Sequence, residues 1–324
     1  EQFNLIGAGR RNLVMNGGFD VWQRGTTVTK ASNSYQNFTS DRWSAYFAGT
    51  YSKQTTTLPN GDYVNYFRGV LGTTGSNRIN INHFIENGNS IFSGKYITVS
   101  FWLKASVIDS QVNVKIQTTS GSTFSSYTLI ANKYIETSLD WKKYEITLKC
   151  NNDIANIGAR AHGLLEIDGV DGSWANGTTF EIAQVQIELG KVATPFEHRS
   201  YGEELALCQR YFCSSFPTGT APAHGLNINY QGVAGWTTFS STAARSPFIY
   251  YPVTMRATPS LTLYSCANDT SGQWGIYTGS WDGSSTQATD STNKNFNVRI
   301  NSGISGAINQ SYLIRGNWTA SSEL

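Results

Sequence analysis

The sequence predicts an all-β protein made of antiparallel sheets. Short stretches of alternating apolar and polar residues recur along the chain, and Asn-Gly or Asp-Gly pairs separate several of them. Aromatic residues reach 13% of the composition while charged residues stay at 14%, a balance that favours packed sheets over charged helical surfaces. At 324 residues the chain is long enough for two such domains.

The clearest alternation lies in the first two thirds of the chain. Apolar side chains occupy every second position over 97–103, 112–116, 144–148 and 183–189. In the last of these stretches we expect Ala183 and Val185 on one face and Gln184 on the other. Tight turns are predicted at Asn60-Gly61 and at Asp168-Gly169, because glycine adopts the positive φ that such turns need. Together these signals predict a β-sandwich.

A single helix interrupts the strand pattern at residues 200–212, SYGEELALCQRYF. Ser200 and Glu203 form a capping box, and Tyr201, Leu205, Cys208 and Phe212 follow at helical spacing. This helix sets the predicted domain boundary. We expect an attachment stub at 1–11, a first domain at 12–199, a connecting helix at 200–214 and a C-terminal β-sandwich at 215–324.

Composition excludes several classes of partner. The formal net charge is +2 and the basic residues form no stripe that could follow a phosphate backbone, so nucleic acid is not expected. No apolar run approaches the ~18 residues that span a bilayer, and the N-terminus lacks the order of a signal peptide. Neither membrane insertion nor a cofactor is expected. The four cysteines are interpreted as buried thiols, with a Cys208–Cys213 disulfide as the alternative.

Catalytic motifs are absent from the sequence. No G-x-S-x-G elbow occurs, and the four histidines are isolated from one another, so neither a nucleophilic nor a metal-dependent hydrolase is indicated. We therefore predict no catalytic residues, no metal ligands and no enzyme. Glycoside cleavage stays open as an alternative, because two carboxylates brought together by the fold would suffice.

Five segments resemble a family of bacteriophage and prophage tail-fibre proteins in their order and spacing. They are RNLVMNGGFDVWQRGT (11–26), SDRW (40–43), KYITVSFWLKAS (95–106), IAQVQIELGKVATPFEHRSYGEELALCQRYF (182–212) and YPVTMRATPS (251–260). The resemblance implies a homotrimeric fibre in the virion, attached to other tail or baseplate proteins through its N-terminal end. It also implies that the C-terminal domain points outward.

The first domain of such proteins is similar to the jelly-roll carbohydrate-binding modules of polysaccharide-degrading enzymes. Those modules open on an Asn-Gly-Gly-Phe-Glu-like turn, here residues 16–20, and close on an Asp-Val-x-Leu strand, here 184–187. Acidic residues at these places help to hold a structural calcium in the modules. This chain has the neutral Gln184 where the closing strand would carry Asp, so one calcium ligand is missing and the presence of a structural calcium stays open.

Sugar recognition needs flat aromatic rings surrounded by amides and carboxylates. Trp274, Tyr277 and Trp281, with Asp282 beside them, offer these groups in one loop-rich stretch and are the candidate glycan-binding residues of the fibre tip. The alternative is that these rings pack in the core of the second domain or in a trimer interface. Trp102 is a further candidate, opposite the apolar face of 97–103, with burial beneath a second layer as its alternative.

The sequence thus predicts a receptor-binding protein that attaches a phage to a bacterial surface polysaccharide by non-catalytic, multivalent binding. Two other functions stay open. A structural baseplate or collar component would have no affinity for glycans, and a depolymerase would release reducing ends from the polysaccharide that it binds.

Overall fold

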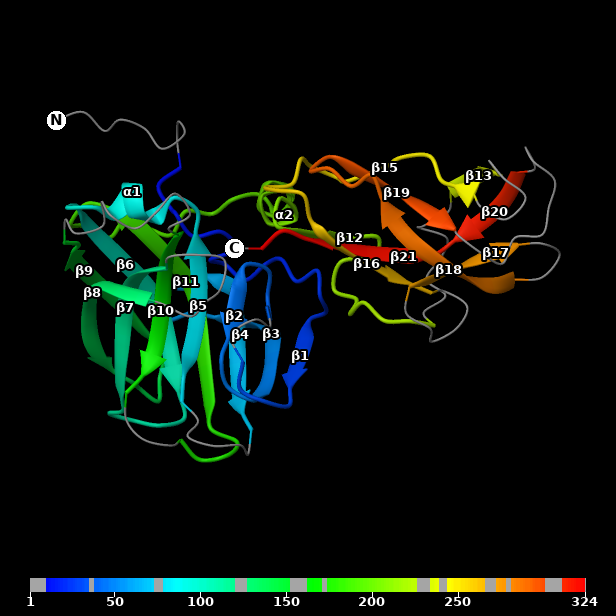
Figure 1. Ribbon diagram of the computed structural model, residues 1–324. Coiled ribbons are helices and arrows are strands. Elements are labelled where there is room, and N and C mark those ends of the chain that lie inside the picture. The colour runs from blue at the N-terminus through cyan, green and yellow to red at the C-terminus, as the bar shows by residue number, and fades with distance from the viewer. Residues whose placement is uncertain are drawn as a thin grey trace. The chain divides into compact units, whose positions relative to one another are not determined.

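The computed structural model describes residues 10–34, 38–72, 78–119, 127–151, 162–170, 174–225, 234–238, 244–265, 272–277, 281–300 and 311–323. Within these ranges the chain is mainly strands, joined by turns and two short helices (Figure 1), which confirms the predicted all-β class. The chain divides into two compact units. Unit 1 contains the residues up to Trp22 and Thr26–Glu204, and unit 2 contains Gln23–Gly25 and Leu205–Glu323.

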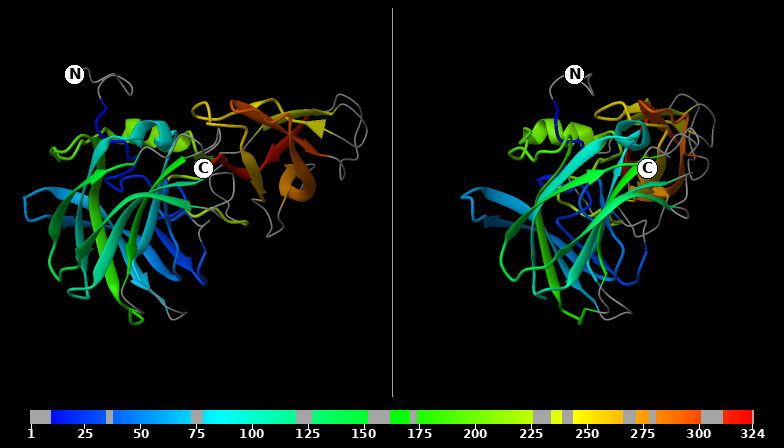
Figure 2. Two further views of the ribbon diagram at one scale, coloured as in Figure 1. Left: turned by 60° about the vertical axis from the view of Figure 1, so that its left-hand side comes forward. Right: turned by 90° about the vertical axis from the view of Figure 1, so that its left-hand side faces the viewer.

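Unit 1 is a sandwich of two antiparallel sheets, visible from two directions in Figure 2. The six-stranded sheet has the order β1 (Thr27–Lys30), β3 (Gly49–Thr57), β4 (Tyr63–Leu71), β11 (Thr179–Leu189), β6 (Tyr96–Ala105), β9 (Lys142–Lys149). The five-stranded sheet has the order β2 (Trp43–Ala45), β5 (Asn80–Ile85), β10 (His162–Gly169), β7 (Gln111–Thr119), β8 (Tyr127–Glu136). A one-turn helix α1 (Gly88–Phe92) follows β5.

The two sheets of unit 1 share one apolar core. Phe101 and Ile146 contribute from the six-stranded sheet, and Val114 and Ile167 contribute from the five-stranded sheet, all of them buried. The alternation predicted over 97–103, 112–116 and 144–148 therefore reports the core-facing side of three real strands. Each inner face buries apolar side chains, which leaves the two outer faces for polar or binding functions.

The Asn-Gly-Gly-Phe turn closes this core. Asn16 donates from Nδ2 to the carbonyl oxygens of Val21 (2.8 Å) and Asp41 (3.0 Å), and its own carbonyl accepts a hydrogen bond from Nε1 of Trp43 (3.0 Å). A Cβ at Gly17 would overlap the carbonyl oxygen of Val185, so only glycine fits there. The motif that carries the family resemblance is thus a structural one in this chain.

Helix α2 (Tyr201–Gln209) is shorter than predicted and buries only part of the predicted stripe. Ser200 Oγ accepts the backbone N–H of Glu203 at 3.3 Å, which is one of the two hydrogen bonds of the predicted capping box. Tyr201 is exposed, however, and the buried positions of the helix are Glu204 and Cys208. Glu204 accepts the N–H of Asn16 (2.6 Å), and this contact rotates a carboxylate into the buried face. In the described part of the chain no helix is long and apolar enough to cross a membrane.

Unit 2 contains a three-stranded sheet, β12 (Phe212–Ser214), β21 (Asn317–Ser321), β16 (Ser260–Tyr264). Its larger sheet has the order β14 (Ala244–Arg245), β13 (Ala234–Thr238), β20 (Ser311–Arg315), β17 (Gln273–Tyr277), β18 (Trp281–Thr289), β19 (Asn295–Ile300), β15 (Ile249–Tyr250). Because β14 also pairs with β19, this sheet closes on itself. Phe296 and Trp318 pack in its core with ring centroids 5.3 Å apart.

Three cysteines lie in the described residues, and all three are buried thiols, as predicted. Burial raises the pKa of Cys150 to about 11 and the pKa of Cys213 to about 12. Such thiols are protonated at neutral pH and are poor nucleophiles. Cys266 lies outside the described residues.

Candidate functional site

The structure places Trp274 where no sugar can reach it. Its side chain is 0% exposed, its ring lies against Gly316, and its Nε1 donates to the carbonyl oxygen of Asn317 at 3.2 Å. Its prediction as a glycan contact is wrong, because its ring fills the core of unit 2 together with Phe296 and Trp318.

The other candidates of unit 2 lie on strands and not in a loop. Tyr277 ends β17 and pairs with Trp281 at the start of β18, while Asp282 pairs with Ile276. These residues therefore form an antiparallel hairpin, although the sequence around them is rich in glycine, serine and asparagine. The side chains of Tyr277, Trp281 and Asp282 lie outside the described residues, so their glycan contacts stay predictions.

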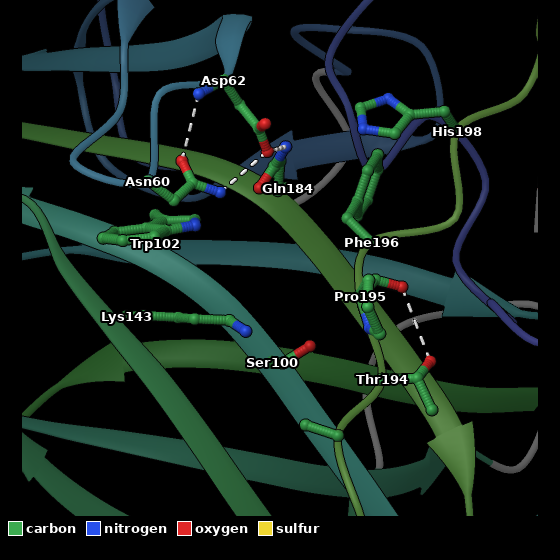
Figure 3. A pocket seen from close by; sticks show the side chains of 11 residues that line it. Asn60, Asp62, Ser100, Trp102, Lys143, Gln184, Thr194, Pro195, Phe196 and His198 are labelled. Carbon is green, nitrogen blue, oxygen red and sulfur yellow. Dashed lines mark hydrogen bonds between the residues drawn. The ribbon is translucent and has the colours of Figure 1, made fainter.

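Trp102 lines a hollow of about 440 Å³ on the outer face of the six-stranded sheet of unit 1 (Figure 3). Ser100 and Trp102 alternate along β6 with core residues, and Gln184 and Lys143 come from the neighbouring strands β11 and β9. This site, the Trp102 pocket, is lined by Asn60, Asp62, Ser100, Trp102, Lys143, Gln184, Ala193, Thr194, Pro195, Phe196 and His198.

The turn between β3 and β4 forms one wall of the pocket. The N–H of Leu58 donates to the carbonyl of Asp62 and the N–H of Gly61 donates to that of Leu58, both at 2.9 Å. Gly61 has φ +92°, as the predicted Asn60-Gly61 turn requires. The closed turn brings the side chains of Asn60 and Asp62 together, with Asn60 Nδ2 donating to Asp62 Oδ2 at 2.8 Å.

A β-bulge supplies the next residue. The register between β11 and β6 shifts between Ala183 and Gln186, and Gln184 adopts φ +49°. Because of this extra residue, Ala183 packs beside Trp102 on the outer face while Val185 stays in the core, so the predicted alternation of these two on one face is wrong. The bulge directs the Gln184 side chain to Asp62, and its Nε2 donates to Asp62 Oδ2 at 3.0 Å.

The opposite wall is the segment 193–198, which is fastened to the outer face of β11. Glu188 accepts hydrogen bonds from the N–H of Thr194 (2.9 Å) and from its Oγ1 (2.5 Å). Gln186 Oε1 accepts the N–H of Glu197 at 2.8 Å. This wall is therefore held at two points by side chains of the strand it covers. Phe196 and His198 stack edge to face on it, with centroids 5.0 Å apart.

Trp102 offers its edge and not its face to the pocket. The residue is 8% exposed, and its ring packs with Val64, Tyr66 and Ala183 in a small apolar cluster outside the main core. In Figure 3 the indole nitrogen faces the hollow, and among the described residues none accepts a hydrogen bond from it. Trp102 can therefore donate one hydrogen bond to a bound molecule, while Phe196 provides an apolar ring.

The pocket carries one free acceptor of particular interest. Hydrogen bonds from Gln184 and Asn60 hold the pKa of Asp62 below its usual range, with a smaller contribution from His198. Lys143 Nζ contributes a cation at another wall and pairs with Glu145 at 2.7 Å. Donors, an ionised acceptor and an apolar ring around one small hollow form an arrangement that suits a hydroxyl-rich molecule.

Sequence reasoning found Trp102 but missed its neighbours in the pocket. Asn60, Asp62, Lys143 and Phe196 lie on segments far apart in the chain, so no local pattern joins them. One signal was present, the Asn60-Gly61 turn that forms a wall of the pocket. Within the described residues no group of three or more His, Cys, Asp or Glu side chains could hold a metal ion.

The outer face of the five-stranded sheet carries a second set of polar residues, which we call the polar stripe: Asn80, Asn82, Lys115, Gln117, Glu166 and Asp168. Lys115 Nζ lies 2.7 Å from Asp168 and 3.5 Å from Glu166, and Asn80 Nδ2 donates to both carboxylates. Burial raises the pKa of Glu166, and Lys115 partly offsets this effect.

The predicted Asp168-Gly169 turn is wrong, because both residues belong to β10.

The two outer faces differ in what their polar groups contact. In the polar stripe the charged groups contact one another, and the asparagines, Gln117 and both carboxylates are buried. Gln117 Oε1 and Asn82 Oδ1 are buried acceptors without a partner in the described part of the chain. In the Trp102 pocket the donor and the acceptor that have no partner among the described residues face an open hollow instead of being buried.

No family model and no curated protein matches the sequence. Among solved structures, one described as "CBM4 structure and function" has 19% identity and a TM-score of 0.35, and covers 55% of this chain and 99% of that one. The CBM22-2 xylan-binding domain of Paenibacillus barcinonensis Xyn10C has 13% identity, a TM-score of 0.32 and coverages of 46% and 92%. The enzymatically active domain of bacteriophage CBA120 tailspike protein 4 has 14% identity, a TM-score of 0.32 and coverages of 55% and 21%. At such TM-scores these similarities transfer no ligand to this chain.

Proposed function

We propose that unit 1 binds saccharides without cleaving them, and that the Trp102 pocket is the place of contact. The observation that carries this proposal is an open hollow in which one carboxylate oxygen of Asp62 and the indole N–H of Trp102 have no hydrogen-bond partner among the described residues. Its volume, about 440 Å³, falls in the range of small-molecule sites. A hydroxyl group can both donate and accept a hydrogen bond. A pyranose can therefore donate to the Asp62 carboxylate and accept from the Trp102 indole N–H, while its apolar side contacts Phe196.

The wider proposal is attachment of a bacteriophage to a bacterial surface polysaccharide. Its support is the resemblance of five sequence segments to tail-fibre proteins, together with a pocket that suits sugars. In this proposal the chain is a homotrimer of the virion, joined to other tail or baseplate proteins at its N-terminal end. Tethered copies raise avidity about 10²-fold or more over a single site, so a shallow pocket suffices.

In this proposal unit 2 adds a second contact through Tyr277, Trp281 and Asp282 on the β17–β18 hairpin. Trp274 is not part of it, because that ring is buried.

Cleavage of the glycan is the rival function, and the geometry favours binding over it. A glycosidase needs two carboxyl groups on either side of the scissile bond. Of the residues that line the Trp102 pocket, Asp62 is the one carboxylate. Glu166 and Asp168 lie on the same face of β10, but each of these carboxylates is buried. Lys115 and Asn80 contact both carboxylates, so neither faces an open site.

Binding of the purified chain to an array of bacterial surface polysaccharides tests the proposal, with Phe196→Ala as the pocket variant. Phe248→Ala is the matched control, because that phenylalanine is exposed in unit 2. We expect Phe196→Ala to weaken binding and the control to leave it unchanged. Absence of binding to any glycan would favour the structural baseplate role, and release of reducing ends by the same preparation would favour the depolymerase.

A mass measurement of the assembled protein tests the trimer separately. Three chains per particle would agree with the fibre proposal. A monomer would remove the avidity argument while leaving the pocket itself open to test.

A further inference from the structure

One carboxylate oxygen of the Trp102 pocket has no hydrogen-bond partner in the part of the chain that the structure describes. Both amides that contact Asp62, from Asn60 and Gln184, donate to Oδ2, at 2.8 and 3.0 Å. Oδ1 accepts no hydrogen bond from the described residues, and Asp62 lines the hollow. A carboxylate has room for about four hydrogen bonds, so Oδ1 can accept from a ligand without losing its present partners.

The position of this oxygen is fixed by the backbone. The turn 58–62 is closed by two main-chain hydrogen bonds, and the Asp62 N–H also donates to Asn60 Oδ1 at 3.3 Å. The bulge at Gln184 holds the second amide in place. An acceptor that is oriented before the ligand arrives loses little conformational freedom on binding, which favours selectivity.

The positive charge that Lys143 brings to the pocket is already paired. Lys143 Nζ lies 2.7 Å from the carboxylate of Glu145, outside the pocket. Among the described residues, the hydrogen-bond donors to the Asp62 carboxylate are two neutral amides, and the basic side chain that adds an electrostatic contribution is His198, which also lines the hollow. A ligand that brings a second negative charge to this wall would place two anions side by side, which costs binding energy.

We propose that Asp62 determines the specificity of the pocket, accepting hydrogen bonds from the hydroxyl groups of neutral saccharides and rejecting saccharides with a carboxylate, phosphate or sulfate at that position. This inference rests on the proposed sugar-binding function and names the class of sugar. A uronic-acid residue and the hexose obtained from it by carboxyl reduction differ in the charged group alone, so Asp62 discriminates between them.

The test compares polysaccharides that contain uronic acids with their carboxyl-reduced forms, on wild-type protein, Asp62→Asn and Asp140→Asn. Asp140 is the matched control, because it is exposed in the turn before β9 and does not line the pocket. At about pH 8 we expect wild type to prefer the reduced form by about tenfold or more. We expect Asp62→Asn to bring the ratio close to one and to weaken binding of the neutral form by about tenfold. Asp140→Asn should behave as wild type.

A second measurement needs no variant. Raising the salt concentration screens repulsion between charges, so the preference of the wild-type protein for the neutral form should shrink as salt increases. Equal or tighter binding of the acidic forms, or a ratio unaffected by Asp62→Asn in a folded variant, would overturn the inference while leaving sugar binding intact. Failure to bind any glycan would overturn the proposed function itself.

Discussion

Trp102 and Trp274 are both tryptophans in β-strands, both were candidate sugar contacts, and their environments differ. Trp102 lies on the outer face of a sheet, and its indole N–H, which donates to none of the described residues, faces an open hollow. Trp274 lies inside unit 2, where its ring covers Gly316 and its N–H is used by Asn317. The difference teaches that the face of the strand on which an aromatic ring lies decides whether the ring lines a pocket or fills the core.

The largest effect that separates the two tryptophans is on stability. Trp274→Ala removes a fully buried side chain, and we expect it to lower the free energy of unfolding of unit 2 by about 3 to 5 kcal/mol. Urea unfolding followed by fluorescence and circular dichroism measures this loss. Polysaccharide binding through the Trp102 pocket should persist wherever unit 1 stays folded. A variant of unchanged stability that loses binding would instead return Trp274 to the receptor site.

The strands of this fold were readable from the sequence where each strand buries one face. The alternation over 97–103 and 144–148 matches β6 and β9 because every second residue enters a common core. It failed at Ala183, where a bulge adds one residue and reverses the faces. The alternation also did not predict the strands β17 and β18, because the glycine and serine residues in that stretch are typical of loops.

The site was predictable only in part, for a physical reason. A strand pattern predicts which side chains leave the core but not which distant turn covers them. Asp62 reaches Trp102 only because β4, β11 and β6 are neighbours in the sheet, and Phe196 reaches it because Gln186 and Glu188 fasten the segment that follows β11. These contacts depend on strand order and on a segment held by side chains of a neighbouring strand, so the spacing of residues in the sequence does not predict them.

Trp281→Ala is the next test, because it asks whether unit 2 adds a contact of its own. Removing an aromatic platform weakens each site by roughly 1 to 2 kcal/mol, so we expect about a tenfold loss of avidity for the polysaccharide. Surface plasmon resonance on immobilised polysaccharide measures it, with Phe248→Ala as the control. Unchanged avidity in a folded variant would confine receptor binding to unit 1.

Trp102→Phe addresses the indole N–H alone. The substitution keeps an aromatic ring in the cluster of Val64 and Tyr66 but removes the donor, so we expect affinity to fall about fivefold, the value of one neutral hydrogen bond. Trp141→Phe is the matched control, because that ring packs against the same cluster without lining the pocket. Calorimetric titration measures both. Equal losses in the two variants would mean that the cluster, and not the N–H, supports binding.

The smallest effect is on pH dependence, and it follows from Asp62. Hydrogen bonds from Gln184 and Asn60 lower the pKa of this carboxyl group in the folded protein. The contribution of these bonds to stability is therefore complete above the unfolded pKa of about 3.9 and is lost as the pH falls through the lower folded value. We expect affinity for a neutral saccharide to stay level from about pH 7 to about pH 4 and to fall only below that.

Other charged groups in and beside the pocket could also change the affinity as the pH falls. Among the described residues these are His198 and Lys143, which line the pocket, and Glu145, which pairs with Lys143. His198→Asn and Glu145→Gln, each combined with wild-type Asp62, show how much of any acid-induced loss belongs to them. In Asp62→Asn the acid limb should disappear, because the amide cannot be protonated in this range. If affinity still falls at low pH in Asp62→Asn, protonation of another group controls binding. Asp62 would then not be the acceptor that the Trp102 pocket offers to a saccharide.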